Sequence, residues 1–228
     1  MNKNTVYTVS LLLIICICTA YLEIFPENPD RLSAPEILTD IKNTEIIENK
    51  YEKGILTDTS FESKFLNLRF TIPENFTMST EAELIQMVEM GAEVLSDDLK
   101  EKYDYLKADT VYEMAAASKT GAPSIMVGVE KLTLKSATVQ HYINILTESV
   151  PNSNKVVAYE VREAEKVRQI AGQEYKRLSF SGIANGIPFI QDYYINKIDD
   201  RMVFFIVVYL EDTTQEVEEI LSSFTPYE

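Results

Sequence analysis

Apolar and polar side chains follow a strand pattern most clearly in the C-terminal third of the chain, where three antiparallel strands are predicted. These strands are expected at residues 175–184, 187–198 and 201–210. Asn185-Gly186 is a strong hairpin signal, because both residues tolerate the positive φ of a type I′ turn. Asp199-Asp200 predicts the next tight turn. The last strand is apolar almost throughout, which is typical of a central strand covered on both faces.

Further strands are expected earlier in the chain. In residues 66–72 every second residue is apolar, which is the pattern of a half-buried strand. Residues 54–63 predict a strand before it. Residues 110–118 and 124–132 flank a turn at 119–122 and predict a hairpin.

Helical spacing of apolar residues predicts the helices between these strands. Thr80 and Glu83 form a capping box at the start of one helix. A short helix is expected at residues 97–106, and another helix at 136–149.

The last strand is followed by a final predicted helix. Thr213 and Glu216 are expected to cap this helix, and its apolar side chains to pack on the sheet. Helices between runs of antiparallel strands predict the α+β class. We therefore expect an antiparallel β-sheet covered by helices, in one domain that follows an N-terminal hydrophobic helix.

The first 22 residues form a hydrophobic segment. Lys3 precedes it, residues 6–22 carry no charge, and Glu23 is the first charged residue after it. Positive charge before and negative charge after predict export of the rest of the chain. Two fates stay open: cleavage as a signal peptide after Ala20, or retention as an anchor that holds the chain in the membrane through residues 6–22.

Both cysteines of the chain, Cys16 and Cys18, lie in this hydrophobic segment. A lipid anchor on either cysteine is a further alternative, although isoleucine precedes each of them where a lipobox has a small residue. The exported part has no thiol, and therefore no disulfide and no thiolate metal site. We expect residues 23–50 to be a spacer and residues 51–228 to form the folded domain.

The formal net charge of the chain is −15. Such an acidic protein repels phosphate backbones, so we expect no nucleic-acid partner.

His141 is the only histidine and is expected on a helix surface without a catalytic partner. We expect no metal and no cofactor. Two acidic clusters lack calcium-loop spacing and are interpreted as solvated faces: Glu160, Glu163 and Glu165, and Asp97, Asp98, Glu101 and Asp104.

The two predicted turns fix a register that brings polar side chains together on one face of the C-terminal sheet. Ser179 then faces Asp192, and Arg177 is the diagonal neighbour of Asp192. The residues on this face are Arg177, Ser179, Asp192, Tyr194 and Tyr209. One interpretation is a ligand-binding pocket. The other, which we favour, is a structural ion pair across the strands.

Several short stretches resemble exported PsbP-like proteins, including DcrB-type bacterial lipoproteins. The stretches that carry the resemblance are Gly54, 61–63, 66–76, 129–132 and 172–175. Phe76 departs from the family, which commonly has tryptophan there, and no lipobox is present. The resemblance covers residues 51–226 and implies an α/β/α sandwich. It implies no catalytic residues, and it suggests an accessory or binding protein.

Export without a catalytic set of residues favours a non-catalytic binding or accessory domain, tethered to the membrane or secreted. Its expected partner is an envelope protein or a small ligand. A carboxylate-dependent extracellular hydrolase is one alternative, and it needs two acids about 5 to 10 Å apart in a cleft. A structural subunit of an envelope complex is the other, and it needs an exposed apolar patch.

Overall fold

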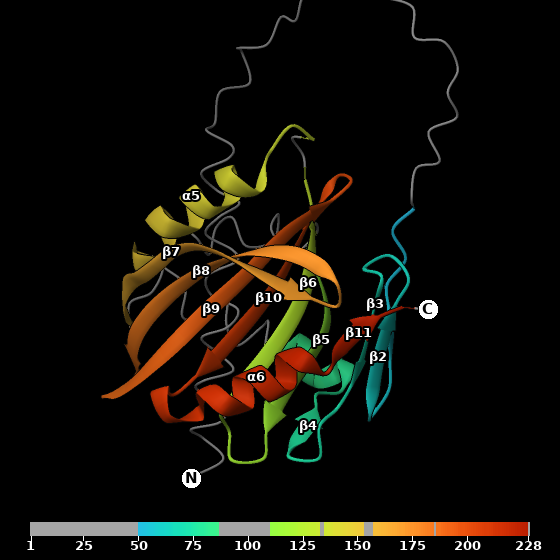
Figure 1. The fold of residues 1–228 in the computed structure, drawn as a ribbon, viewed down its shortest axis with the longest axis horizontal. Helices are drawn as coiled ribbons and strands as arrows, with labels where there is room; N and C mark the ends of the chain where they lie inside the picture. Colours follow the sequence, from blue (N-terminus) through green and yellow to red (C-terminus); the bar gives the residue numbers. More distant parts are fainter. Residues whose placement is uncertain (1–49, 87–109, 133–134, 153–156, 185, 228) are drawn as a thin grey trace, which may run out of the picture.

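The computed structural model of the chain describes residues 50–86, 110–132, 135–152, 157–184 and 186–227. The described residues form two antiparallel sheets and a few helices (Figure 1). The leader and nearly all of the predicted spacer lie outside the described residues. So do the predicted helix at 97–106 and all but the start of the helix that follows Thr80.

The larger sheet has seven strands. In spatial order they are β4 (Phe76–Met78), β5 (Thr110–Ser118), β6 (Ser124–Lys131), β10 (Arg201–Tyr209), β9 (Ile187–Ile198), β8 (Gln173–Ala184) and β7 (Ala158–Ile170). β10 lies in the middle, as its apolar sequence predicts. It is buried from Met202 to Tyr209.

The C-terminal meander has the predicted register. Across the β8–β9 turn, Ser179 is opposite Asp192 and Arg177 is opposite Tyr194. Across the next turn, where Asp199 has a φ of 52°, Asp192 is opposite Val207. The prediction from the two tight turns is therefore confirmed.

The smaller sheet has four strands and was not predicted as a separate sheet. Its order is β1 (Ile55–Leu56), β2 (Ser60–Ser63), β3 (Leu68–Thr71) and β11 (Phe224–Pro226). The prediction of one continuous strand over residues 54–63 was wrong. The Thr57 hydroxyl accepts a hydrogen bond from the Ser60 amide at 2.9 Å, which closes a turn and pairs β1 with β2.

The two capping predictions have different outcomes. The Thr80–Glu83 capping box is confirmed: the Thr80 amide donates to Glu83 Oε2 at 2.7 Å, and the Glu83 amide donates to Thr80 Oγ1 at 3.3 Å. The Thr213 prediction is confirmed for the position alone: Thr213 is the N-cap residue of α6 (Thr214–Ser222), but its side chain makes no capping hydrogen bond to that helix. Its hydroxyl accepts from the Leu210 amide at 3.1 Å and closes the short 3₁₀ turn η2 (Glu211–Thr213).

The helix predicted at 136–149 is α5 (Val139–Ser149), which continues as a 3₁₀ turn, η1 (Val150–Asn152). It starts three residues later than predicted, because the Thr138 side chain accepts from the His141 amide and caps it there. His141 is exposed on this helix, as predicted.

Hydrophobic clusters cover both faces of the seven-stranded sheet. Phe204 and Phe205, neighbours on β10, belong to different clusters because successive side chains of a strand point to opposite faces. α5 packs with Phe204 through Tyr142 and Leu146. On the other face, α6 and the four-stranded sheet pack with Phe205.

The prediction of an antiparallel α+β protein is confirmed for the described residues, in which strands dominate. The helix-covered sandwich is not confirmed, because the four-stranded sheet occupies part of one face. The N-terminal hydrophobic helix lies outside the described residues.

Candidate functional site

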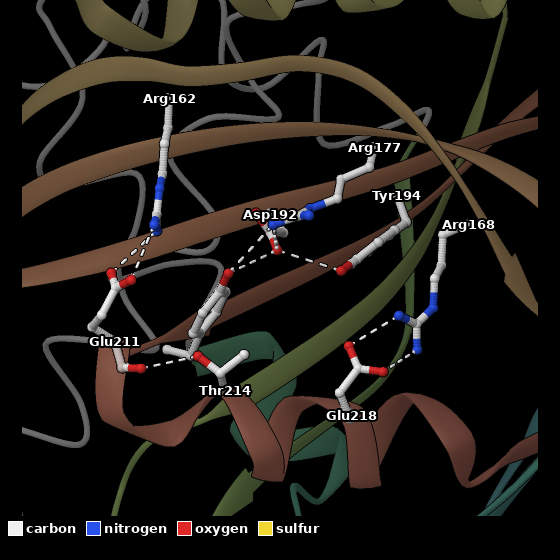
Figure 2. A network of polar contacts seen from close by, with 9 residues as sticks. Arg162, Arg168, Arg177, Asp192, Tyr194, Glu211, Thr214 and Glu218 are labelled. Atoms are coloured by element: carbon white, nitrogen blue, oxygen red, sulfur yellow. Dashed lines mark hydrogen bonds and ion pairs between the residues drawn. The ribbon is translucent and has the colours of Figure 1, made fainter.

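Five predicted site residues converge on the face of the sheet that α6 covers. Three adjacent strands supply them: β8 carries Arg177 and Ser179, β9 carries Asp192 and Tyr194, and β10 carries Tyr209. Figure 2 labels Arg177, Asp192 and Tyr194 of this group. The tight turns hold these strands in register, so side chains far apart in the sequence meet. A role of these residues in ligand binding stays a prediction.

Asp192 is the centre of this group, and its side chain is only 1% exposed. Its Oδ2 accepts from Arg177 Nη2 at 2.9 Å and from the Tyr209 hydroxyl at 3.1 Å. The Tyr194 hydroxyl donates to the same oxygen at the longer distance of 3.4 Å. A buried carboxylate is tolerated only with such partners, because burial in a medium of low dielectric disfavours its charge.

The titration behaviour of the neighbours reflects this buried charge. Burial, followed by the charge of Asp192, raises the pKa of Tyr209 to about 12. Burial and Asp192 also raise the pKa of Tyr194. Burial is the largest single influence on Arg177 and lowers its pKa, but Asp192, Tyr194 and Tyr209 together outweigh burial, so the net pKa is raised. The charged guanidinium and the two protonated hydroxyls thus form one unit around Asp192.

Two buried oxygens in this group have no hydrogen-bond partner among the described residues: Asp192 Oδ1 and Ser179 Oγ. The two residues lie opposite each other on β9 and β8. Neither oxygen is accessible to solvent. The group is therefore a closed polar cluster under α6, and any opening to a ligand must lie beside it.

Two further arginines, both on the edge strand β7, connect this strand with the elements that cover the face (Figure 2). Arg162 makes a two-pronged ion pair with Glu211 of η2, at 3.0 and 3.2 Å. Arg168 makes a similar pair with Glu218 of α6, at 2.6 and 2.9 Å. Such parallel pairs fix orientation as well as distance.

An opening lies next to the Asp192 cluster, between η2 and the ends of β7, β8 and β9. It is a cleft of about 700 Å³. Ser181 and Ile190 in its lining are two residues away from Ser179 and Asp192 on the same strands, and so on the same face. α6 supplies no lining residue, so the helix leaves this end of the β8–β9 hairpin uncovered.

The lining of the cleft is mostly apolar. The apolar residues in its lining are Ala158, Ile183, Ile187, Pro188, Phe189, Ile190 and Leu210. Ile183 is 55% exposed and lies on the same face as Ser181. Ile187 and Phe189 alternate to the other face of the sheet, where Phe189 packs in the cluster around α5.

Charged side chains stand around this apolar surface. The cleft is lined by Glu160, Arg162, Glu211 and Asp212, together with the hydroxyl of Ser181. Glu211 is paired with Arg162. Glu160 and Asp212 are exposed, and neither has an ion-pair partner among the described residues.

The cleft itself was not predicted from the sequence, because it depends on β7 and η2, and neither element was expected. β7 contains many charged residues, which hide the strand pattern. One signal was present: Ala171 and Gly172 both have positive φ, 50° and 75°, and make the two-residue turn that joins β7 to β8. Glycine in such a turn is a hairpin signal.

The other predicted sites have the following outcomes. Glu160 is exposed, as expected, but lies in the cleft; the side chains of Glu163 and Glu165 and the second acidic cluster lie outside the described residues. Where the structure is described, no three His, Cys, Asp or Glu side chains are grouped to hold a metal ion. None of the described helices combines the length and apolar character needed to cross a membrane.

No family model matches the chain, and no curated protein matches it. Among solved structures, it is similar to PsbP from the cyanobacterium Synechocystis sp. PCC 6803, with 12% identity and a TM-score of 0.46 over 79% of this chain and 99% of the other. A Bacteroides thetaiotaomicron protein has 6% identity and a TM-score of 0.43, covering 76% of this chain and 50% of the other.

A third similar structure is LpqN, involved in cell envelope biogenesis of Mycobacterium tuberculosis. It has 9% identity and a TM-score of 0.41, over 69% of this chain and 82% of that one. A PsbP structure is thus among the solved structures that this chain resembles, in agreement with the resemblance expected from the sequence. The similarity concerns the fold alone.

Proposed function

We propose that this protein is an exported, non-catalytic binding domain of the cell envelope, and that it binds its ligand in the cleft between η2 and the β8–β9 hairpin. The observation that carries the proposal is the cleft itself, with its apolar lining and charged rim. Its volume falls in the range of small-molecule sites, which are mostly apolar with a few polar groups that orient the ligand.

The leader supports the location. Its charge pattern, from Lys3 to Glu23, directs the rest of the chain outward. If residues 6–22 stay in the membrane, residues 23–50 serve as a tether that lets the domain reach a partner. The helix that begins after Thr80 fits the proposed sandwich, because Leu84 packs in the same cluster as α5.

The cleft can be tested with a local reporter, because the chain contains no tryptophan. Ile183→Trp places the only tryptophan at the exposed rim of the cleft, on the same face of β8 as Ser181. The full-length chain is reconstituted in phosphatidylcholine vesicles and titrated with octanol, a small apolar probe. We expect a saturable shift of the tryptophan emission.

The matched control is Ile55→Trp on the four-stranded sheet, an isoleucine that is 69% exposed against 55% for Ile183. Octanol dissolved in the vesicles affects both reporters alike, so only a saturable change confined to the I183W chain supports the cleft. Identical responses of the two reporters would contradict the proposed function.

One observation favours a second candidate, the carboxylate-dependent hydrolase. The cleft carries three acids, Glu160, Glu211 and Asp212, and paired acids are what glycoside hydrolysis requires. If this candidate is correct, Glu160→Gln abolishes the hydrolysis of wall polysaccharide by the full-length chain. Hydrolysis at an undiminished rate, or none in the natural chain, would exclude it.

A further inference from the structure

The charges around the cleft are unbalanced. Among the described residues that line the cleft, Arg162 is the only cation, and Glu211 already holds it through two hydrogen bonds. Glu160, near the start of β7, and Asp212, in η2, have no cationic partner among the described residues. A ligand that enters the cleft therefore meets two negative charges that nothing on the described surface compensates.

The same lining contains an exposed apolar surface. Ile183, close to the β8–β9 turn, is 55% exposed although it is large and apolar, and Pro188 opposite it is also exposed. Covering such side chains with an apolar ligand is favourable, by about 25 cal/mol for each Å² removed from water. A ligand with an alkyl or ring portion fits here, and its charged end lies near Glu160 or Asp212.

We propose that the cleft binds a small apolar molecule that carries a positive charge, such as an alkyl ammonium compound. This proposal rests on the proposed function, because it names the chemistry of the ligand in the same cleft. Charge complementarity determines the sign: an anionic ligand would meet Glu160, Asp212 and a chain of net charge −15. The cleft volume of about 700 Å³ suits one small molecule.

The test uses the I183W reporter in phosphatidylcholine vesicles and three probes with the same alkyl chain: octylammonium, octanol and octanoate. We expect octylammonium to bind about three- to tenfold more tightly than octanol, and octanoate to bind more weakly than both. Two exposed charge contacts give a preference of about this size. The preference should shrink at high salt, because exposed charges are screened.

The charge variant is Glu160→Gln combined with Asp212→Asn, in which we expect the preference for octylammonium to be lost. The matched control, Glu174→Gln with Glu219→Gln, removes two exposed acids that do not line the cleft and should keep it. A preference that persists in the charge variant, or is lost equally in the control, would overturn the inference.

The possible results separate the two proposals. If none of the three probes gives a saturable signal that is specific to the I183W reporter, the proposed function fails. If octanol binds as tightly as octylammonium, or octanoate binds most tightly, the cleft is a binding site but not one for cations, and only the inference fails. A basic, apolar peptide that displaces octylammonium at far lower concentration would also overturn it, in favour of a peptide ligand.

Discussion

Two arginine–carboxylate pairs lie on the same side of the sheet, one at the Asp192 cluster and one at the cleft. Their contact distances are nearly equal, 2.9 Å for Arg177–Asp192 and 3.0 Å for Arg162–Glu211. Their environments differ: the side chains of the inner pair are 26% and 1% exposed, and those of the outer pair 41% and 77%.

The comparison shows that distance alone does not determine what an ion pair contributes. In the inner pair, a charge without its partner would be left in a place that water does not reach. In the outer pair, water replaces a lost partner at little cost. The inner pair therefore joins β8 and β9 inside the structure, whereas the outer pair lies at the surface and contributes little to the stability of the fold.

The largest expected effect comes from Arg177→Met, which leaves the buried Asp192 carboxylate without its guanidinium. We expect the free energy of unfolding to fall by about 3 to 5 kcal/mol, as is found when one partner of a buried pair is removed. Urea unfolding of the full-length chain at neutral pH measures the loss, as a lower midpoint at unchanged slope.

The control combines Arg177→Met with Asp192→Leu. This double variant leaves no buried charge behind, so we expect it to recover most of the lost stability. A loss below about 1 kcal/mol for the single variant would mean that the two tyrosine hydroxyls suffice for Asp192, and that burial does not separate the two pairs.

The inner pair was predictable from the sequence and the outer pair was not, for a physical reason. Two-residue turns fix the register of adjacent strands, so Asn185-Gly186 and Asp199-Asp200 were enough to place Arg177 beside Asp192. The Arg162–Glu211 pair joins an edge strand to a 3₁₀ turn that lie far apart in the sequence. No local pattern encodes where two such elements meet.

The same distinction applies to the fold. A period-two pattern predicted β3, because one face of that strand is buried. The strands β5 and β6 and the C-terminal meander were predicted from the turns between apolar segments. β7 was missed since an edge strand can carry charges on exposed positions. β11 was missed because Phe224–Pro226 is too short for a periodic pattern, and only its pairing with β3 makes it a strand.

A smaller effect is expected from Tyr209→Phe, which removes one donor to Asp192 and keeps the ring. We expect a loss of about 1 kcal/mol in the free energy of unfolding at neutral pH, the usual size for one hydrogen bond. Tyr175→Phe is the control, because the buried Tyr175 hydroxyl has no partner among the described residues, and it should cost less.

The same substitution changes the response to alkaline pH. The pKa of Tyr209 rises from 10.0 to about 12 on folding. The folded state therefore keeps a proton that the unfolded state loses, and the stability gained from this group is complete below pH 10 and is lost as the pH rises through about 12. Between pH 9 and roughly 12 the free energy of unfolding should therefore fall less steeply with pH for Tyr209→Phe than for the natural chain. An equal fall in both chains would show that Tyr209 is not buried beside Asp192.

The smallest effect is expected from Glu211→Gln, which removes the ion pair at the rim of the cleft. Glu211 is mostly exposed, so water solvates Arg162 once its partner is gone, and we expect a loss below about 1 kcal/mol at low ionic strength. The loss should vanish near 1 M salt, where the Debye length is about 3 Å.

Arg177→Met should keep most of its effect under the same conditions, because the inner pair is shielded from ions. Urea unfolding of both variants at two salt concentrations makes the comparison directly. Equal losses with equal salt dependence would show that burial does not set the two pairs apart, and the cleft rim would then have to be regarded as part of the stable framework.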